Sequence, residues 1–242
     1  MLASTRGIIF RATKYSETSL ICDIYTEKFG LTTYIIHGVR KAKAKVSADI
    51  MRLMSIVDME IYYQEQKKIN RIKEISLNYI YQQLPFDVMR GSVGLLMTEV
   101  ARKSIREVAQ NRELFAFLSA SYQLLDTIET SLANFHLAFL TQLTQYLGIR
   151  PYGKYKKEAS YFDYKEGTFV DSKPEHTYYF NLLNSKILYT LLDIELKDCA
   201  ALPLNGKLRR SFLEDILRHY RYHIENFPTI NSHSVLQEVW KQ

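Results

Sequence analysis

Cysteine is scarce in this chain, since Cys22 and Cys199 are the only two among 242 residues. Two thiols far apart cannot build the disulfide framework of a small secreted domain, and they cannot supply a four-cysteine zinc site within one chain. Cys22 lies in an alternating apolar stretch, so we expect it to be a small buried side chain.

Long apolar runs are also missing, because no stretch approaches the roughly 18 residues that a membrane span needs. The first residues, MLASTRGII, lack the hydrophobic segment of a secretory signal peptide. The chain still has 47% hydrophobic residues, which is enough for a buried core. We therefore expect a cytoplasmic protein that does not contact a membrane.

Catalytic motifs are the third absence. The sequence has no GxxxxGK[ST] phosphate-binding loop, no GxGxxG after a strand and no GxSxG elbow. His219 and His223 have the spacing of two helical metal ligands, but no Glu follows His219 and no third ligand is apparent. We expect a protein that is not an enzyme and that holds no metal and no cofactor.

The first third of the chain alternates apolar and polar residues, as strands do. The alternating segments are 7–13, 20–25, 31–38, 56–63 and 69–77, with a longer connector at 47–54. Five short strands with a longer link between the third and the fourth indicate an OB-fold barrel, and an SH3-like barrel is the nearest alternative.

The pattern changes at Leu84-Pro85, where helical spacing of apolar residues begins. The helical stretches are 86–106, 113–128, 132–147, 178–194, 207–226 and a short one from about 234. A polar segment near 152–176 contains a β-hairpin around Lys165–Gly167. The sequence thus predicts an α+β protein, with a five-stranded OB-fold domain at 1–80 and a mainly α-helical domain with a small β-hairpin insertion at 81–242.

Positive charge is concentrated in the first third. Residues 1–80 hold 13 Lys and Arg against 8 Asp and Glu, whereas residues 81–242 hold 19 against 18. Four cations gather in the loop after the third strand, namely Arg40, Lys41, Lys43 and Lys45. Cations at this density cannot pack in a core, so they are either solvated or bound to an anion, and a loop of this kind suits phosphate contacts.

Three residues of the strands accompany this loop. Arg11 and Lys14, at the end of the first strand, would extend the cationic track. Tyr34, near the loop, is a candidate platform for stacking on a base, although a tyrosine on a sheet is as often a packed rim residue.

A second cationic group lies on the predicted helix 207–226. Its arginines can share one helix face, and they are Arg210, Arg218 and Arg221. This group is either a solvated face, a second nucleic-acid contact or a socket for an acidic peptide.

Several short motifs, taken in order, resemble those of the RecO family of bacterial recombination mediators. The motifs are GIIFR (7–11), YSETSL (15–20), YTEKFG (25–30), HGVRKAK (37–43), LGIRP (147–151), FDYKEGTF (162–169) and SHSVLQEV (232–239). Each motif is weak alone, but their order and spacing extend over nearly the whole chain.

The resemblance implies an OB-fold followed by a helical domain, without catalytic turnover. It also implies DNA repair and recombination by binding single- and double-stranded DNA and annealing complementary strands, in association with the nucleoid. The implied partners are the mediator RecR, the acidic C-terminal tail of the single-stranded-DNA-binding protein SSB and, indirectly, the recombinase RecA. A basic-rimmed apolar groove on the helical domain would receive the tail, with Arg210, Arg218 and Arg221 as candidates for its rim.

The sequence departs from this family in one respect. Many members carry a four-cysteine zinc insertion after the segment that matches residues 147–151, whereas residues 152–183 here contain no cysteine. We therefore expect the hairpin to be held without zinc, by packing of Tyr161, Phe162 and Phe169.

Two other functions stay open from the residues alone. A barrel with a basic loop also suits an RNA- or tRNA-binding accessory protein, or a non-catalytic scaffold for an acidic protein.

Overall fold

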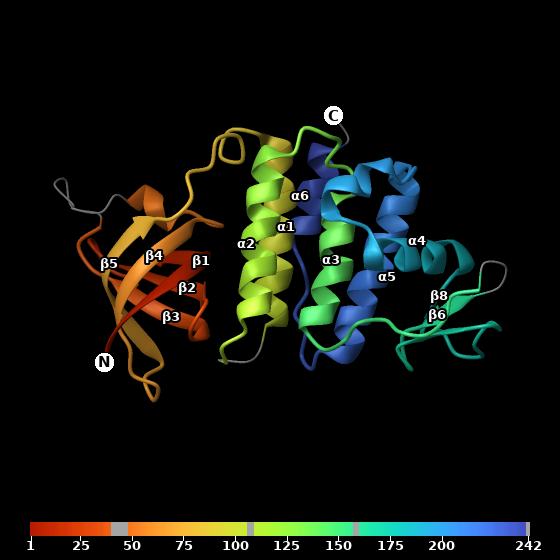
Figure 1. Cartoon of the computed structure of the whole chain (residues 1–242), viewed down its shortest axis with the longest axis horizontal. Helices are drawn as coiled ribbons and strands as arrows, with labels where there is room; N and C mark the ends of the chain where they lie inside the picture. Colours follow the sequence, from red (N-terminus) through yellow and green to blue (C-terminus); the bar gives the residue numbers. More distant parts are fainter. Residues whose placement is uncertain (40–47, 106–108, 157–159, 241–242) are drawn as a thin grey trace. The chain divides into compact units, whose positions relative to one another are not determined.

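The computed structural model describes residues 1–39, 48–105, 109–156 and 160–240. The chain divides into two compact units, which we call unit 1 (Met1–Thr127) and unit 2 (Ile128–Gln242). Unit 1 holds a barrel and two helices, and unit 2 holds further helices and a small sheet (Figure 1). The barrel strands end at Leu77 and the first helix begins at Val88, on either side of the predicted boundary at residue 80, while compactness groups the first two helices with the barrel.

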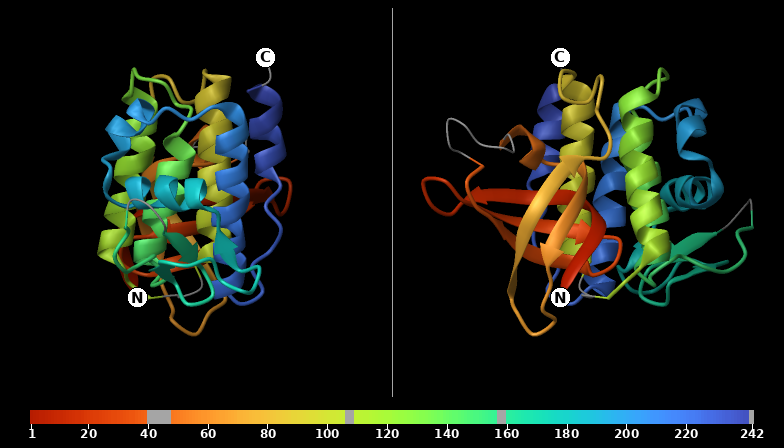
Figure 2. Two further views of the ribbon diagram at one scale, coloured as in Figure 1. Left: turned by 90° about the vertical axis from the view of Figure 1, so that its right-hand side faces the viewer. Right: turned by 60° about the vertical axis from the view of Figure 1, so that its left-hand side comes forward.

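Unit 1 begins with a closed five-stranded barrel, which confirms the predicted OB-type architecture. Neighbouring strands follow the order β1-β2-β3-β5-β4, and all pairs are antiparallel except β3 with β5. The elements are β1 (Leu2–Lys14), β2 (Leu20–Thr26), β3 (Gly30–Ile36), the 3-10 turn η1 (Ala48–Met51), β4 (Ile56–Tyr62) and β5 (Ile69–Leu77) (Figure 2).

A bulge interrupts β1. Ile9 pairs with Ile24 of β2, but the next pair is Arg11 with Asp23, so Phe10 is an extra residue in its strand. One extra residue reverses the face to which the following side chains point. Strict alternation places Arg11 on the interior face together with Ile9, whereas the bulge directs it outward, with 52% of its side chain exposed.

Apolar side chains from all five strands fill the barrel interior, among them Ile9, Cys22, Ile24, Tyr34, Ile36, Val57, Met59, Ile61, Ile72 and Ile75. Gly7 allows the strands to approach closely, because a Cβ there would lie 2.7 Å from Ile24 Cγ2 and 2.9 Å from Met59 Cε. Cys22 is buried as expected, and burial raises the pKa of its thiol to about 12.

Helices α1 (Val88–Ser104) and α2 (Arg112–Thr127) complete unit 1. Tyr25 of β2 stacks between Phe10 and Phe115 of α2, with ring centroids 5.8 and 6.4 Å away. This aromatic stack buries Phe10 and Tyr25, on the outer face of β1 and β2, beneath α2.

Asp126, in the last turn of α2, holds the segment that links β5 to α1. Its buried carboxylate accepts the N–H groups of Gln82, Gln83 and Leu84 and the hydroxyl of Tyr79, at 2.7–3.2 Å. Burial alone would raise the pKa of Asp126, but these donors outweigh it and the pKa lies below its ordinary value.

The helices of unit 2 are α3 (Phe135–Tyr146), α4 (Leu182–Asp193), α5 (Gly206–His223) and α6 (Ser232–Val239), with the 3-10 turn η2 (Leu196–Ala201). Helices α3, α4 and α5 pack on one another in pairs. The side chain of Asn205 caps α5 by accepting the N–H of Leu208 at 2.9 Å. The amide of Asn134 donates to the carbonyls of Cys199 and Leu202, which fixes η2 at the start of α3.

A small sheet packs against α4, with the order β7-β6-β8. Its strands are β6 (Tyr161–Asp163), β7 (Thr168–Val170) and β8 (Tyr179–Phe180), so the predicted hairpin gains a third strand. The ring of Phe162 lies 5.2 Å from those of Phe169 and Phe180, and Tyr161 meets Tyr179 edge-on. The aromatic packing expected of this hairpin is therefore present.

Candidate functional site

In unit 1, the last residue of β1, the first residue of β2 and the last residue of β3 lie side by side. Lys14 of β1 pairs with Leu20 of β2, and Leu20 pairs with Ile36 of β3. A contact of 2.9 Å between Ser19 Oγ and His37 Nδ1 joins the β1–β2 turn to the residues after β3. We call the region formed by residues 14–19 and 36–39 the barrel end. Lys14 and Glu17 are both exposed there, and no carboxylate of the described residues lies within ion-pair distance of Lys14.

The four predicted cations of the basic loop, Arg40, Lys41, Lys43 and Lys45, lie outside the described residues. The chain leaves the barrel at Val39 and is described again from Ala48, where η1 begins. Because β3 ends beside β1 and β2, the segment that carries these cations starts at the barrel end. Their contact with nucleic acid stays a prediction.

Arg11 is not free at the surface of the barrel. Its Nε lies 2.9 Å from Asp23 Oδ2, and Nη1 of Arg102, on α1, lies 3.8 Å from the same oxygen. The hydroxyl of Thr33 donates to the other oxygen of Asp23 at 3.1 Å. One carboxylate thus faces two guanidinium groups, and the cluster keeps a net positive charge. A phosphate that binds Arg11 would have to compete with Asp23.

Tyr34 is not the stacking platform that we expected. Its side chain is 0% exposed and belongs to the interior of the barrel, where burial raises the pKa of its hydroxyl to about 12. Tyr34 pairs with Cys22 and shares its inward direction, which the sequence pattern did not reveal. Tyr15, next to Lys14, is by contrast 65% exposed at the barrel end.

The three arginines predicted on α5 do not form one group. Arg210 lines a pocket at the start of the helix, whereas Arg218 pairs with Asp215 at 3.0 Å. Arg221 is exposed one turn from the end of α5, 11 positions after Arg210, which is about 16 Å along a helix. Of the three, Arg210 is therefore the one that lines this pocket.

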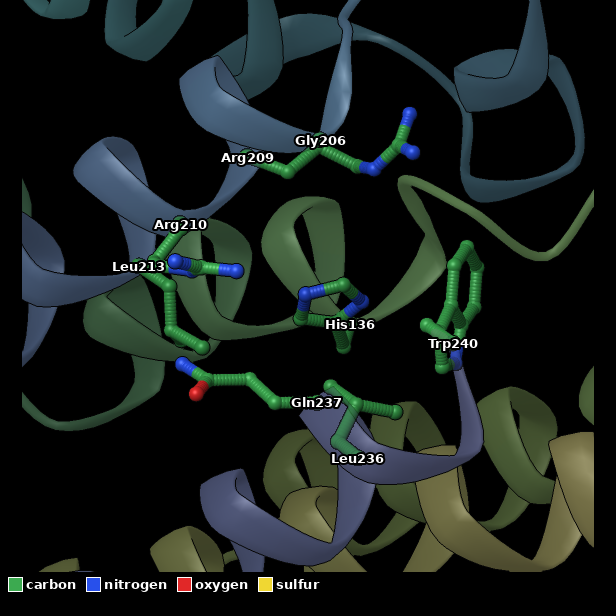
Figure 3. Close-up of a pocket in the computed structure, with 8 residues that line it drawn as sticks. All are labelled: His136, Gly206, Arg209, Arg210, Leu213, Leu236, Gln237 and Trp240. Carbon is green, nitrogen blue, oxygen red and sulfur yellow. The ribbon is translucent and has the colours of Figure 1, made fainter. Parts of the chain in front are cut away.

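The pocket of unit 2 collects side chains from three helices. Its lining residues are His136 of α3, Gly206, Arg209, Arg210 and Leu213 of α5, Leu236 and Gln237 of α6, and Trp240 (Figure 3). Figure 3 shows His136 in the middle, Arg210 and Leu213 on one side and Trp240 on the other. The pocket thus combines an apolar lining with two guanidinium groups.

His136 adds no positive charge to this pocket. The side chain is 4% exposed, and burial together with the nearby charge of Arg209 lowers the pKa of its imidazole to about 3. Its Nδ1 has no hydrogen-bond partner among the described residues. The cations of the pocket are therefore Arg209 and Arg210, beside the N-terminus of an 18-residue helix that also favours anions.

The sequence marked only part of this pocket. Arg209 and Arg210 lie in the basic run at the start of α5, which the sequence displays, but His136 and Trp240 come from segments far away in the chain. Arg102 is missed for the same reason, since its meeting with Asp23 depends on how α1 packs on the barrel.

His219 and His223 are engaged elsewhere. His219 Nε2 lies 2.8 Å from the carbonyl oxygen of Ile149, and His223 Nε2 lies 2.6 Å from that of Tyr164, so both imidazoles donate N–H groups to the backbone. Within the described ranges, no group of three or more His, Cys, Asp or Glu residues could hold a metal ion. Similarly, no helix there is long and apolar enough to cross a membrane.

Fold and site together define a protein with a closed OB-type barrel followed by a helical unit. Residues 1–81 match the family model described as recombination protein O N terminal, and residues 85–231 match the one described as recombination protein O C terminal. These two models cover most of the chain. The chain therefore belongs to the recombination protein O (RecO) family, as the motifs predicted.

Full-length relatives agree with this assignment. The chain is 32% identical to the DNA repair protein RecO of Bacteroides fragilis over 241 residues, which cover 99% of this chain and 100% of that protein. It is 33% identical to the protein of the same name from Christiangramia forsetii, with the same coverage. For that of Phocaeicola vulgatus the identity is 29% over 240 residues, again 99% and 100% of the two chains. The chain is thus a DNA repair protein of the RecO family.

Proposed function

We propose that this protein is a recombination mediator that binds single- and double-stranded DNA and anneals complementary strands. It also helps to load a recombinase onto DNA coated with SSB. The observation that carries this proposal is the convergence at one end of the barrel, where exposed Lys14 and Tyr15 lie beside the start of the segment with four cations. Membership of the RecO family supports it.

Charge gives the barrel end a physical role in annealing. Two DNA strands repel each other through their phosphates, and bound cations reduce that repulsion while they release counterions. Lysine and arginine contacts to phosphate do not read sequence, so one surface can hold any pair of complementary strands. Tyr15 can add stacking on an unpaired base, which is equally tolerant of sequence.

The protein acts by binding, without turning over a substrate. Cations and an exposed ring at the barrel end can hold a polyanion, and the relatives are named as repair proteins. This role places the protein at the nucleoid.

The partners are RecR and SSB, with RecA served indirectly. The pocket of unit 2 is the receptor for the acidic C-terminal tail of SSB, because Arg209 and Arg210 can pair with carboxylates while Leu213 and Leu236 receive an apolar end. Arg218 and Arg221 lie outside this lining, so the rim is narrower than the sequence implied.

Annealing of SSB-coated complementary oligonucleotides tests DNA handling and partner recognition in one assay. We expect the protein to accelerate duplex formation with intact SSB, and to lose this effect when SSB lacks its acidic tail. Competition with RNA of the same sequence separates the proposal from an RNA-binding role. Annealing no faster than the spontaneous rate, on bare and on coated strands alike, would refute the proposal.

A further inference from the structure

We propose that unit 2 carries its own contact for single-stranded nucleic acid, in which a base stacks on the ring of Tyr189 while lysines beside it pair with phosphates. We call this surface the tyrosine edge, and it consists of Lys154, Tyr155, Lys186 and Tyr189. The inference rests on the proposed function and deepens it, because a protein that anneals two strands needs to hold more than one of them.

Two rings are stacked at the edge of the small sheet. The ring of Tyr189, on α4, lies 4.7 Å from that of Tyr155 and nearly parallel to it, at an angle of 19°. Buried Phe169 of β7 supports both, with its ring centroid 5.7 Å from that of Tyr155 and 6.0 Å from that of Tyr189. Tyr189 is nevertheless 44% exposed. A ring that is supported by neighbours and still open to solvent is a platform on which a base can continue the stack.

The segment that carries Tyr155 runs along β7 and is pinned on both sides. Before it, the N–H of Tyr152 donates to the carbonyl of Gly167 at 3.0 Å, and the N–H of Phe169 donates to the carbonyl of Tyr152 at 3.2 Å. After it, the N–H of the next residue, a lysine, donates to the hydroxyl of Ser160 at 2.7 Å. The ring stack is therefore in place before a ligand arrives, which lowers the entropic cost of binding.

Lysines flank the two rings. Lys186 lies one turn before Tyr189 on α4, and long helical side chains lean toward the start of their helix, so the ring of Tyr189 lies over the turn that carries Lys186. Lys154 directly precedes Tyr155 in the chain. Both lysines are exposed, and neither forms an ion pair with a carboxylate of the described residues. A cation beside an exposed ring matches the phosphate and the base of a nucleotide.

The described carboxylates near this edge are balanced by cations of their own. Asp171 forms an ion pair with Lys156, and Asp193 forms one with Arg150 at 2.7 Å. Glu166, exposed in the hairpin turn, directly follows a lysine that is also exposed. The two lysines of the tyrosine edge therefore leave it with an excess of positive charge, which favours a polyanion.

Rings and cations together select an unpaired strand. In duplex DNA the faces of the bases are covered by neighbouring base pairs, so a duplex cannot stack on Tyr189. A single strand offers both its phosphates and free base faces, and stacking on an aromatic ring does not depend on the sequence of bases. We therefore expect the tyrosine edge to raise the affinity for single strands and to add little to the affinity for duplex DNA.

Oligonucleotides with and without bases measure the stacking. The full-length protein with its four basic-loop cations replaced by Ala is titrated with labelled oligo-dT and with an abasic oligonucleotide of the same length, which keeps the phosphates. Adding Tyr189→Ala should weaken the binding of oligo-dT about tenfold and leave that of the abasic oligonucleotide nearly unchanged. Tyr189→Phe keeps a ring and should restore most of the lost affinity. In the wild-type protein, oligo-dT that carries 5-iododeoxyuridine should cross-link to Tyr189 on irradiation, as mapped by mass spectrometry.

Matched substitutions serve as controls. Tyr222→Ala removes a ring of α5 that is 43% exposed and lies outside the tyrosine edge, so it should leave the binding of both oligonucleotides unchanged. Lys186→Ala should reduce the slope of log affinity for oligo-dT against log salt by about 0.7, the value for one phosphate contact of a single strand. Thermal melting of each variant shows that it is folded.

The outcomes distinguish this inference from the proposed function. If oligo-dT does not cross-link to Tyr189 and Tyr189→Ala keeps full affinity, the tyrosine edge is wrong and the barrel end stands. An equal loss for the abasic oligonucleotide would show that stacking is not involved and would overturn the inference. Slower annealing of SSB-coated strands alone, with unchanged affinity for bare strands, would identify the edge as a protein contact and overturn it too. If the wild-type protein binds no nucleic acid, the proposed function fails and the inference with it.

Discussion

At the barrel end of unit 1, Lys14 and Tyr15 are open to solvent at the ends of strands, and Asp23 is the carboxylate that faces the nearby arginines. In unit 2, Arg209 and Arg210 stand beside apolar side chains and a buried imidazole. Exposed cations attract any polyanion and are weakened by salt, because each contact releases counterions. Cations beside an apolar hollow select a ligand that has both charge and a ring.

The difference teaches that charge alone does not define a binding site in this protein. The cations proposed to act at the barrel end are near one another in sequence, and on the proposed function they would select for phosphate density. The pocket requires α3, α5 and α6 to meet, so its lining combines cations with apolar side chains from distant segments. A substitution in one unit can therefore be compared with a matched substitution in the other.

The largest expected effect concerns the basic loop. Replacing Arg40, Lys41, Lys43 and Lys45 with Ala should reduce the slope of log affinity for duplex DNA against log salt by about 0.9 for each lost phosphate contact, or roughly three to four in all. The matched control replaces four exposed lysines of unit 2 with Ala, Lys154, Lys165, Lys186 and Lys197. An equal change in both variants would mean that DNA affinity follows net charge and not the barrel end.

Acid should destabilise unit 2 through His136 and His219. Burial lowers their pKa values from the ordinary 6.5 to about 3 and about 4. Below pH 6.5 these histidines are protonated in the unfolded chain but stay neutral in the folded chain. The free energy of unfolding therefore falls as the pH drops. At pH 5 the loss is about 2 kcal/mol for each histidine.

Chemical denaturation at pH 7.5 and pH 5 measures this loss. In His136→Leu the difference between the two pH values should shrink by about 2 kcal/mol, whatever the stability of the variant at pH 7.5. His37, the only histidine of unit 1, is exposed, and the same measurement on His37→Leu is the control for removing a histidine from the surface. A pH difference in His136→Leu as large as that of the wild-type protein would show that the His136 imidazole is protonated in the folded protein.

Asp126→Asn should destabilise unit 1 by about 2–3 kcal/mol, because the buried amide presents donors where the carboxylate accepts three N–H groups and a hydroxyl. The pKa of Asp126 is lowered, so its contribution is full above the ordinary carboxyl pKa and is lost as the pH falls through the lowered value. Denaturation monitored by tyrosine signals measures the loss, and Asp171→Asn, an exposed carboxylate of unit 2, is the control. Peptide binding by the unit 2 pocket should be unchanged below the transition.

The smallest effect sharpens the barrel end itself. Lys14→Ala should reduce the slope of log affinity against log salt by about 0.9. Lys14 has no ion pair among the described residues that must break before it contacts a phosphate. Arg11→Ala should lower it less, because Arg11 exchanges its contact with Asp23 for one with phosphate. A larger effect of Arg11 would mean that Asp23 yields to DNA readily, and Asp23→Asn should then raise the affinity.

Much of unit 1 follows from patterns near in sequence. Alternation marked all five strands, and the resemblance of short motifs identified the family. The sequence could not show the direction of Arg11, because alternation fails at a bulge that depends on pairing with β2. It also could not show that Tyr34 points inward, since both faces of β3 carry residues that suit a buried position.

The pocket of unit 2 shows a second limit of prediction from the sequence. The sequence displays the basic run at the start of α5, and helical spacing predicted the helices that surround it. The sequence does not show that Arg210 lines a pocket while Arg218 pairs with Asp215. The difference between these arginines depends on which element packs against each face of α5.

The sequence by itself determined the barrel, the helices and the concentration of positive charge, because periodicity, caps and composition act over a few neighbouring residues. Only the tertiary structure decided which of these charges are paired, which ring is exposed and which segments form the pocket. The physical reason is that burial and pairing depend on residues distant in the chain, such as His136 and Trp240, which meet only when the helices pack.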